Sequence, residues 1–259
     1  MNNIKRIVVK VGTSSLTYST GNINLRKLSE LVEVLSDVYN SGVEIVLVSS
    51  GAIAVGVGKL GLDSRPSDIA KRQATAAVGQ SELMAIYDRQ FSQYSKTVAQ
   101  MLLTEKDIKE EESRRHLIDT FEALLSYKSI PIVNENDSVS VEEIVNGDND
   151  CLSAEVATLI KADALIIFTD IDGLYDKNPN EEDAKLIHVV EEINEDIEAM
   201  AGSSGTDRGT GGMITKIKAA KIATTEGIDT FILSSSTFKN LYDLLEGKKT
   251  GTLFKGKKQ

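Results

Sequence analysis

The 259-residue sequence is poor in the residues that cross-link small folds or bind metals: it has one cysteine, two histidines, three prolines and no tryptophan. A single cysteine excludes an intramolecular disulfide, which agrees with a reducing compartment. Cys151 would need a positioned base to act as a nucleophile, and only His116 and His188 are available, so we interpret it as a small core residue. Zinc-ligand spacing is missing, and we assign no metal ligand.

Long apolar runs are also missing. No segment approaches the roughly 18 residues of a membrane span, and the N-terminus MNNIKRIVVKVG lacks the apolar core and cleavage site of a signal peptide. Hydrophobic residues at 41% and charged residues at 26% are ordinary for a soluble globular protein. We therefore expect a cytoplasmic protein without membrane association, built as a single domain over residues 1–259.

A net positive charge is the third absence. The sequence has 29 lysines and arginines against 39 aspartates and glutamates, which gives a formal charge of −10. Nucleic-acid backbones are held by basic surfaces, so we expect no nucleic-acid partner. An acidic protein that binds an anion must concentrate its cations locally, and the lysines within motifs therefore matter more than the total charge.

Short apolar, β-rich runs alternate with amphipathic stretches along the chain. The runs are IKRIVVKVG, VEIVLVSSG, TVAQMLLT, IPIVNEND, DALIIFTDIDG and DTFILSSS. Residues 25–39 are the clearest amphipathic stretch and predict a helix with Asn24 as its N-cap and Gly42 beyond its end. Strands that alternate with helices predict an α/β fold with a largely parallel sheet covered on both faces.

Several of the predicted strands end in small or polar residues. These clusters are residues 12–15, 49–51, 134–137 and 169–170. In open α/β sheets, ligands bind outside the carboxyl ends of the strands. The clusters therefore predict one composite site at one edge of the sheet.

Residues 56–61, GVGKLG, match the dinucleotide fingerprint G-x-G-x-x-G of nicotinamide-dependent oxidoreductases. That fingerprint should leave a strand directly and open a helix. Here the preceding strand is predicted to end near Ser49, and LGLDSRPSD reads as a loop. An oxidoreductase is thus only an alternative. The Walker pattern does not occur, and a hydrolase triad lacks its serine elbow.

The stretch GSSGTDRGTGGMITK, residues 202–216, has no apolar side chain before Met213. Its glycines permit backbone conformations that turn successive N–H groups inward, and a helix starting near Met213 adds a partial charge of about +0.5. Lys216 lies in the first turn of that helix and can reach the same anion. The stretch predicts a phosphate site, with a flexible surface loop as the alternative.

The segment GDND, residues 147–150, precedes LSAEVATLI, which reads as a helix. Asp148 or Asp150 could cap that helix. Alternatively, these carboxylates could orient lysines or magnesium beside a phosphate site. The segment TDIDGLYDKNP reads as a strand followed by a turn.

Together these segments resemble the amino acid kinase superfamily, and within it the kinases that act on the side-chain carboxylate of glutamate. The similarity covers nearly the whole chain and implies a three-layer α/β/α sandwich with a mainly parallel central sheet. It also implies that the N-terminal part, about 1–160, binds glutamate and that the C-terminal part, about 161–259, binds ATP. The matching segments are KVGTSSL, VSSGAIAVG, NENDSV, GDND, TDIDGLYDKNP and GTGGMITK.

The resemblance implies phosphorylation of the γ-carboxylate of L-glutamate by ATP with Mg²⁺, the first step of proline biosynthesis. By match of position, Lys10 and Lys216 would stabilise the transferring phosphoryl group, and Asp150 would hold these lysines. Glutamate would be held by Ser50, Asp137 and Asn149. The nucleotide would be held by Lys10, Thr169, Asp170, Thr210, Gly211, Gly212, Met213, Ile214, Thr215 and Lys216.

The resemblance further implies a homo-oligomer, dimer or tetramer, and feedback inhibition by proline. Many family members carry a PUA domain after the kinase, whereas this sequence stops five residues beyond GTLF, so we expect the short form. Val145 stands where some relatives have a basic residue, and residues 138–147 are expected to form a mobile flap over the substrate pocket. Another small-acid kinase of the superfamily is the alternative.

Overall fold

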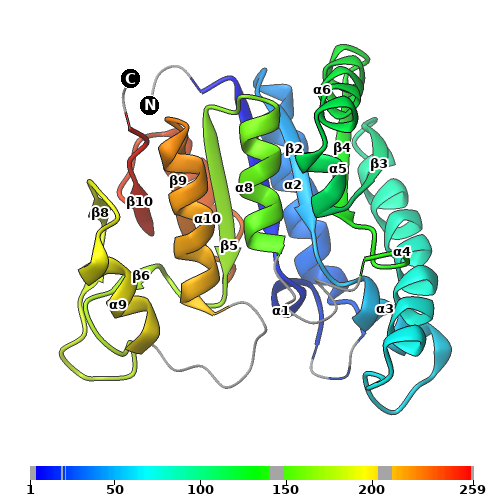
Figure 1. Cartoon of the computed structure of the whole chain (residues 1–259), viewed down its shortest axis with the longest axis horizontal. Coiled ribbons are helices and arrows are strands. Elements are labelled where there is room, and N and C mark those ends of the chain that lie inside the picture. The colour runs from blue at the N-terminus through cyan, green and yellow to red at the C-terminus, as the bar shows by residue number, and fades with distance from the viewer. Residues whose placement is uncertain (1–3, 19, 21, 141–148, 204–211, 258–259) are drawn as a thin grey trace.

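The computed structural model describes residues 4–18, 20, 22–140, 149–203 and 212–257. Its main sheet has eight strands in the order β3-β4-β2-β1-β5-β9-β10-β8, and β6 and β7 form a separate pair (Figure 1). The strands are β1 Arg6–Val11, β2 Glu44–Ser49, β3 Thr97–Leu103, β4 Ser129–Glu135, β5 Ala164–Thr169, β6 Leu174–Tyr175, β7 Leu186–Ile187, β8 Val189–Val190, β9 Asp229–Ser234 and β10 Thr252–Phe254.

The centre of the sheet is parallel. Strand β1 pairs with β2 and β5, β4 pairs with β2 and β3, and β5 pairs with β9, all in parallel, whereas β10 is antiparallel to β9. Strands β1, β2, β4, β5 and β9 are buried along almost their whole length. Runs of Val and Ile suit such strands, because both of their faces pack against apolar side chains.

Helices cover both faces of this sheet (Figure 1). Alternation along β1 separates the two layers: Ile7 and Val9 pack in a core with α2, α4 and α11, whereas Val8 packs in a core with α6, α8 and α10. The predicted three-layer α/β/α sandwich is confirmed. The helices are α1 Thr13–Leu16, α2 Leu25–Asn40, α3 Ala52–Leu60, α4 Ile69–Ser92, α5 Glu105–Lys109, α6 Glu111–Ser126, α8 Asn149–Leu159, α9 Glu195–Ser203, α10 Met213–Thr225 and α11 Asn240–Leu245.

The elements expected from the sequence are present. Each of the six predicted runs contains a strand, and the amphipathic stretch forms α2. Asn24 caps α2 by accepting a hydrogen bond from the backbone N–H of Lys27 at 3.1 Å, and Gly42 follows the helix with φ +99°. Helix α10 starts at Met213 as predicted, whereas α8 starts at Asn149, three residues before the predicted LSAEVATLI segment, so Asp150 lies inside the helix and does not cap it. Within the described residues, no helix is both long and apolar enough to cross a membrane.

The C-terminal edge of the sheet was not predicted. Strands β8 and β10 and the β6–β7 pair are two or three residues long. With α9 and α10 they enclose a small third core, which includes Leu174, Val190, Ile217 and Phe254. The main sheet therefore extends past its parallel centre by an antiparallel strand and a short edge strand.

The glycines of the GVGKLG segment belong to helix packing. Gly56 lies inside α3, and a Cβ there would stand 2.0 Å from the carbonyl oxygen of Thr75 on α4. A Cβ on Gly79 of α4 would in turn stand 1.7 Å from the carbonyl oxygen of Ala52. The backbones of α3 and α4 are thus in contact, and the segment does not open a helix after a strand. Rejection of the dinucleotide fingerprint is confirmed.

Gly79→Ala is expected to lower the free energy of unfolding by about 1–3 kcal/mol, because the added methyl group forces α3 and α4 apart. The urea midpoints of the two proteins measure this change. Gly58→Ala is the matched control, because Gly58 is exposed within α3 and outside the positive-φ region. That substitution should be neutral or stabilise by up to about 1 kcal/mol. Equal destabilisation by both substitutions would contradict the packing role of Gly79.

Candidate functional site

Four parallel strands bring their carboxyl ends to one edge of the sheet, the lower edge in Figure 1. These strands are β4, β2, β1 and β5, and they carry the polar clusters found in the sequence. Helices α8 and α10 lie side by side over the sheet and start at the same edge (Figure 1). The predicted composite edge is confirmed.

A buried carboxylate between two lysines lies at the centre of this edge. Lys10 Nζ is 2.6 Å from Asp150 Oδ1, and Lys216 Nζ is 3.2 Å from Asp150 Oδ2. The Thr215 hydroxyl donates a 2.7 Å hydrogen bond to Asp150 Oδ2. Lys10, Asp150 and Lys216 are 7%, 1% and 5% exposed. The structure thus brings together the three residues that the sequence assigned to phosphoryl transfer.

Secondary structure explains this convergence. Lys10 follows Val8 by two positions on β1, so its side chain leaves the sheet on the face that α8 and α10 cover. Asp150 is the second residue of α8, and Lys216 is the fourth residue of α10, so both lie in first turns. The sequence left two roles open for Asp150, namely to cap a helix or to orient lysines or magnesium. In the structure its side chain contacts the two lysines. Asp148 lies outside the described residues.

The two lysines determine the charge state of Asp150. Burial alone would raise the pKa of Asp150, but the charges of Lys10 and Lys216, with hydrogen bonds from Lys10 and Thr215, together hold that pKa below its ordinary value. Asp150 is therefore ionised at neutral pH. Two lysines and one aspartate leave a net charge of +1 in a buried place. Buried charges require partners, and two ammonium groups held in fixed positions at the sheet edge suit an anionic ligand.

Small residues keep space around the cluster. A Cβ on Gly12, at the end of β1, would lie 3.5 Å from Lys10 Nζ, and a Cβ on Gly212, at the start of α10, would meet nothing within 4 Å. Beyond Gly212, Met213 is buried and Ile214 is 49% exposed. The predicted nucleotide residues Thr210 and Gly211 lie outside the described residues.

The end of β5 contributes Thr169 and Asp170. The Thr169 hydroxyl donates a 3.0 Å hydrogen bond to Asp170 Oδ1, and the Thr169 carbonyl accepts from the Ser235 N–H at 2.6 Å. Thr169 is buried, whereas Asp170 is exposed. These two residues therefore lie at the same edge as the lysine cluster, on the side of β5 and β9.

On the opposite side of β1, a chain of side-chain amides joins Ser50 to the interior. Asn149 Nδ2 donates to Ser50 Oγ at 2.7 Å and to Asn134 Oδ1 at 2.9 Å. Asn134 Nδ2 donates to Gln80 Oε1 at 2.9 Å. The structure thus connects two predicted substrate residues, Ser50 and Asn149, through direct contact.

Asp137 follows β4 and is half-buried. Burial raises the pKa of Asp137 to about 6, and the charge of Arg65, in the loop between α3 and α4, opposes this rise only in part. A carboxylate held in such an environment favours a cationic ligand. Of the predicted flap at 138–147, residues 141–147, including Val145, lie outside the described residues.

Three neighbours of the site were not identified from the sequence. Asn134 was quoted within a motif but given no role, and Gln80 and Arg65 were not considered. Gln80 carried a readable signal: it lies on the buried stripe of α4 formed by Ala76, Leu83 and Tyr87. A polar side chain on an apolar helical stripe requires a buried hydrogen-bond partner.

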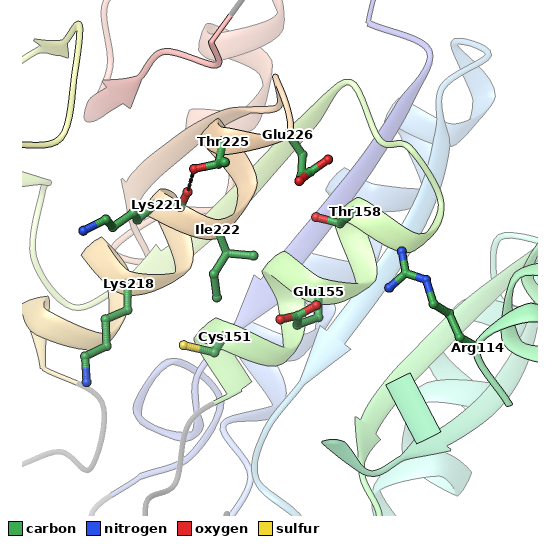
Figure 2. Close-up of a pocket in the computed structure, with 9 residues that line it drawn as sticks. All are labelled: Arg114, Cys151, Glu155, Thr158, Lys218, Lys221, Ile222, Thr225 and Glu226. Carbon is green, nitrogen blue, oxygen red and sulfur yellow. Dashed lines mark hydrogen bonds between the residues drawn. The ribbon is translucent and has the colours of Figure 1, made fainter. Parts of the chain in front are cut away.

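A groove on the outer face of α8 and α10 lies apart from these residues (Figure 2). Its lining includes Cys151, Glu155 and Lys218, with Arg114 of α6, and none of the predicted site residues. Cys151 is half-buried here, with its sulfur on the side that faces α10, so its interpretation as a core residue was wrong. It sits on the outward side of the first turn of α8.

The comparisons with known proteins agree with this geometry. The family model described as amino acid kinase family matches residues 5–234. The chain belongs to the amino acid kinase family. Glutamate 5-kinase of Clostridium perfringens is 52% identical, with 98% of this chain and 96% of the relative covered. Glutamate 5-kinase of Carboxydothermus hydrogenoformans is 48% identical, with 100% of this chain and 70% of the relative covered.

Two solved structures of other kinases have the same fold as this chain. Carbamate kinase from Giardia lamblia bound to AMP-PNP matches with a TM-score of 0.70 at 15% identity, over 99% of this chain and 100% of that chain. UMP kinase from Bacillus anthracis matches with a TM-score of 0.62 at 16% identity, over 98% and 97%. At these identities the likeness concerns the fold alone.

Asp137→Asn is expected to raise the free energy of unfolding of the ligand-free protein at pH 8. The folded-state pKa of Asp137, about 6, exceeds the ordinary value of 3.8, so the folded protein binds the proton more tightly than the unfolded chain. The penalty of the buried carboxylate is complete above pH 6 and shrinks as the pH falls towards 4. The stabilisation by Asp137→Asn should therefore be smaller at pH 5 than at pH 8 in urea unfolding.

Asp63→Asn is the control for loss of one negative charge, because Asp63 is exposed in the loop that contains Arg65. A stabilisation by Asp137→Asn that is equal at the two pH values would show that ionisation of Asp137 does not affect stability.

Proposed function

We propose that the chain transfers the γ-phosphoryl group of ATP to the γ-carboxylate of L-glutamate and forms L-glutamyl 5-phosphate, the first step of proline biosynthesis. Curated relatives named glutamate 5-kinase, at 48–52% identity over nearly the whole chain, support this activity. The buried, net positive cluster of Lys10, Asp150 and Lys216 is the structural observation that carries it.

The cluster suits phosphoryl transfer to a carboxylate. A side-chain carboxyl group with a pKa near 4.3 is already an anion at neutral pH, so the reaction needs no general base. The difficulty is the approach of two anions and the negative charge that spreads over the phosphoryl oxygens in the transition state. Lys10 and Lys216 would stabilise that charge, and Asp150 would keep both ammonium groups in fixed positions.

The order of strands supports a division of the sheet into two half-sites. Strands β3, β4, β2 and β1 come from the N-terminal part, about 1–160, and β5, β9, β10 and β8 from the C-terminal part, about 161–259. Glutamate would bind Ser50, Asp137 and Asn149 on the first half. The nucleotide would bind on the second half, at Thr169, Asp170 and the segment from Thr210 to Lys216. Lys10, at the boundary, would contact the transferring group.

Magnesium would enter with the nucleotide. Mg²⁺ is held mainly by phosphate oxygens and waters in such sites, so a direct protein ligand is not required, and we assign none. When bound, the ion would supply positive charge that offsets the negative charge of the nucleotide phosphates. A homo-oligomer, dimer or tetramer, remains a prediction from the family resemblance.

Lys10→Ala and Lys216→Ala are each expected to lower kcat at least about a hundredfold, because a donor aimed at developing charge contributes roughly 3–4 kcal/mol to transition-state stabilisation. The assay is release of ADP from MgATP in the presence of glutamate. Aspartate, N-acetylglutamate, carbamate and UMP, tested in parallel, distinguish other small-acid kinases of the family.

Lys218→Ala is the matched control, because Lys218 lies on α10 but lines the outer groove. Its kcat should remain close to that of the wild type. Faster ADP release with another acceptor than with glutamate would contradict the proposed substrate. Near-wild-type turnover of Lys10→Ala or Lys216→Ala would remove that lysine from the mechanism.

Proline is expected to inhibit by competing with glutamate. It shares with glutamate an α-carboxylate and a neighbouring nitrogen that is cationic at neutral pH, and Asp137 would pair with that nitrogen in both ligands. Proline should therefore raise the apparent KM for glutamate and leave that for ATP nearly unchanged. Asp137→Ala should raise KM for glutamate about tenfold or more, as loss of a charged hydrogen bond implies, and should blunt the inhibition. Competition of proline with ATP instead would refute the overlapping pocket.

A further inference from the structure

The amide chain beside the lysine cluster runs through the interior. Gln80, Asn134 and Asn149 are 7%, 3% and 2% exposed, and they come from α4, β4 and α8. Successive hydrogen bonds of 2.9, 2.9 and 2.7 Å connect Gln80, Asn134, Asn149 and Ser50. Residues 54 positions apart, Gln80 and Asn134, are thus joined directly. The proposed function gives no role to Gln80 or Asn134.

The chain has a direction. The Gln80 carbonyl accepts from the Asn134 amide nitrogen, so the Asn134 carbonyl faces Asn149 and accepts from its nitrogen. The second N–H of Asn149 Nδ2 donates to Ser50 Oγ, so both amide hydrogens of Asn149 are used. Asn149 Oδ1 is buried and has no hydrogen-bond partner among the described residues. The direction of the chain thus leaves one acceptor unused, and buried acceptors are normally paired.

The position of Gln80 is rigid. Its neighbour Gly79 lies against the Ala52 carbonyl of α3 without room for a side chain. On the same helix, Tyr87 is fully buried and its hydroxyl is 2.8 Å from Ser49 Oγ, at the end of β2. Helix α4 is therefore fixed both to α3 and to the sheet edge, and it holds the Gln80 carbonyl beside Asn134.

We infer that Gln80 is a positioning residue that acts through Asn134 to fix the Asn149 amide with Oδ1 as an acceptor for the α-ammonium group of the substrate. The inference rests on the proposed function, which places an amino acid in this half-site. If the Asn149 amide turned by half a rotation, it would present N–H donors instead, and these would repel an ammonium group. Gln80 therefore favours an amino acid over the same diacid without its amino group.

The test compares glutamate with glutarate, the five-carbon diacid that lacks the amine. Gln80→Met removes the acceptor at nearly constant volume and should lower the ratio of kcat/KM for glutamate to that for glutarate at least about tenfold. Gln80→Glu keeps an acceptor towards Asn134 and should keep the ratio within about threefold of wild type. KM for ATP should stay unchanged in both variants.

Gln90→Met is the matched control, because Gln90 is on the same helix and bonds Ser29 and Gln93 outside the amide chain. Thermal melts verify folding. If Gln80→Met does not fold, Asn134→Leu interrupts the same chain and should lower the ratio equally. If a folded variant lost kcat/KM by the same factor for glutamate and for glutarate, Gln80 would have only a packing role, and the inference would be overturned. So would a Gln80→Glu variant as unselective as Gln80→Met.

The two proposals fail in different ways. Absence of ADP release by the wild type with glutamate overturns the proposed kinase activity. The positioning role is measured as well by the shift of melting temperature that each diacid induces, which needs no turnover. Equal shifts by glutamate and glutarate in the wild type would overturn the role of Asn149 as an ammonium acceptor.

Discussion

The functional edge depends on the ion pairs that one carboxylate makes with two lysines. Asp150 of α8 joins three elements, because its carboxylate pairs with Lys10 of β1 and with Lys216 of α10. Removal of one partner from a buried ion pair costs about 3–5 kcal/mol, because the remaining charge stays buried without compensation. Loss of Asp150 would leave two ammonium groups facing each other. Geometry and charge of the site therefore come from the same interaction.

A second constraint, close packing of helix backbones, supports the other half of the edge. Gly56 and Gly79 let α3 and α4 approach until their backbones touch. That contact fixes α4, and α4 in turn carries Gln80 and Tyr87 to the ends of β4 and β2. The lysine half is thus held by electrostatic attraction, and the amide half by steric fit and hydrogen bonds. Gly56, which belongs to the segment that matches a dinucleotide motif, allows this close packing of α3 against α4.

Much of the fold was readable because its signals are local. Runs of Val and Ile predict buried parallel strands, and Asn24 and Gly42 mark the ends of α2 through short-range hydrogen bonding and backbone conformation. Strands β8 and β10 were missed because two or three residues carry no periodicity, and their pairing depends on distant partners. The Lys10–Asp150–Lys216 cluster was predicted through family resemblance. The polar side chain of Gln80 on the buried stripe of α4 signals a buried partner, but that partner, Asn134, lies 54 positions away and could not be identified locally.

The two halves of the site hold buried charges of opposite sign. The formal charges of Lys10, Asp150 and Lys216 sum to +1, and burial raises the pKa of the Asp137 carboxyl group to about 6. The buried, ionised carboxylate of Asp137 lowers the stability of the ligand-free protein at neutral pH. A phosphate beside the lysines and an ammonium group beside Asp137 would each meet a charge of opposite sign. A ligand bearing only one of these charges would interact favourably with one half of the site alone. The two halves of the edge are opposite in charge and share one sheet. Binding of both substrates should therefore stabilise the protein more than the apolar contacts between substrates and protein alone would.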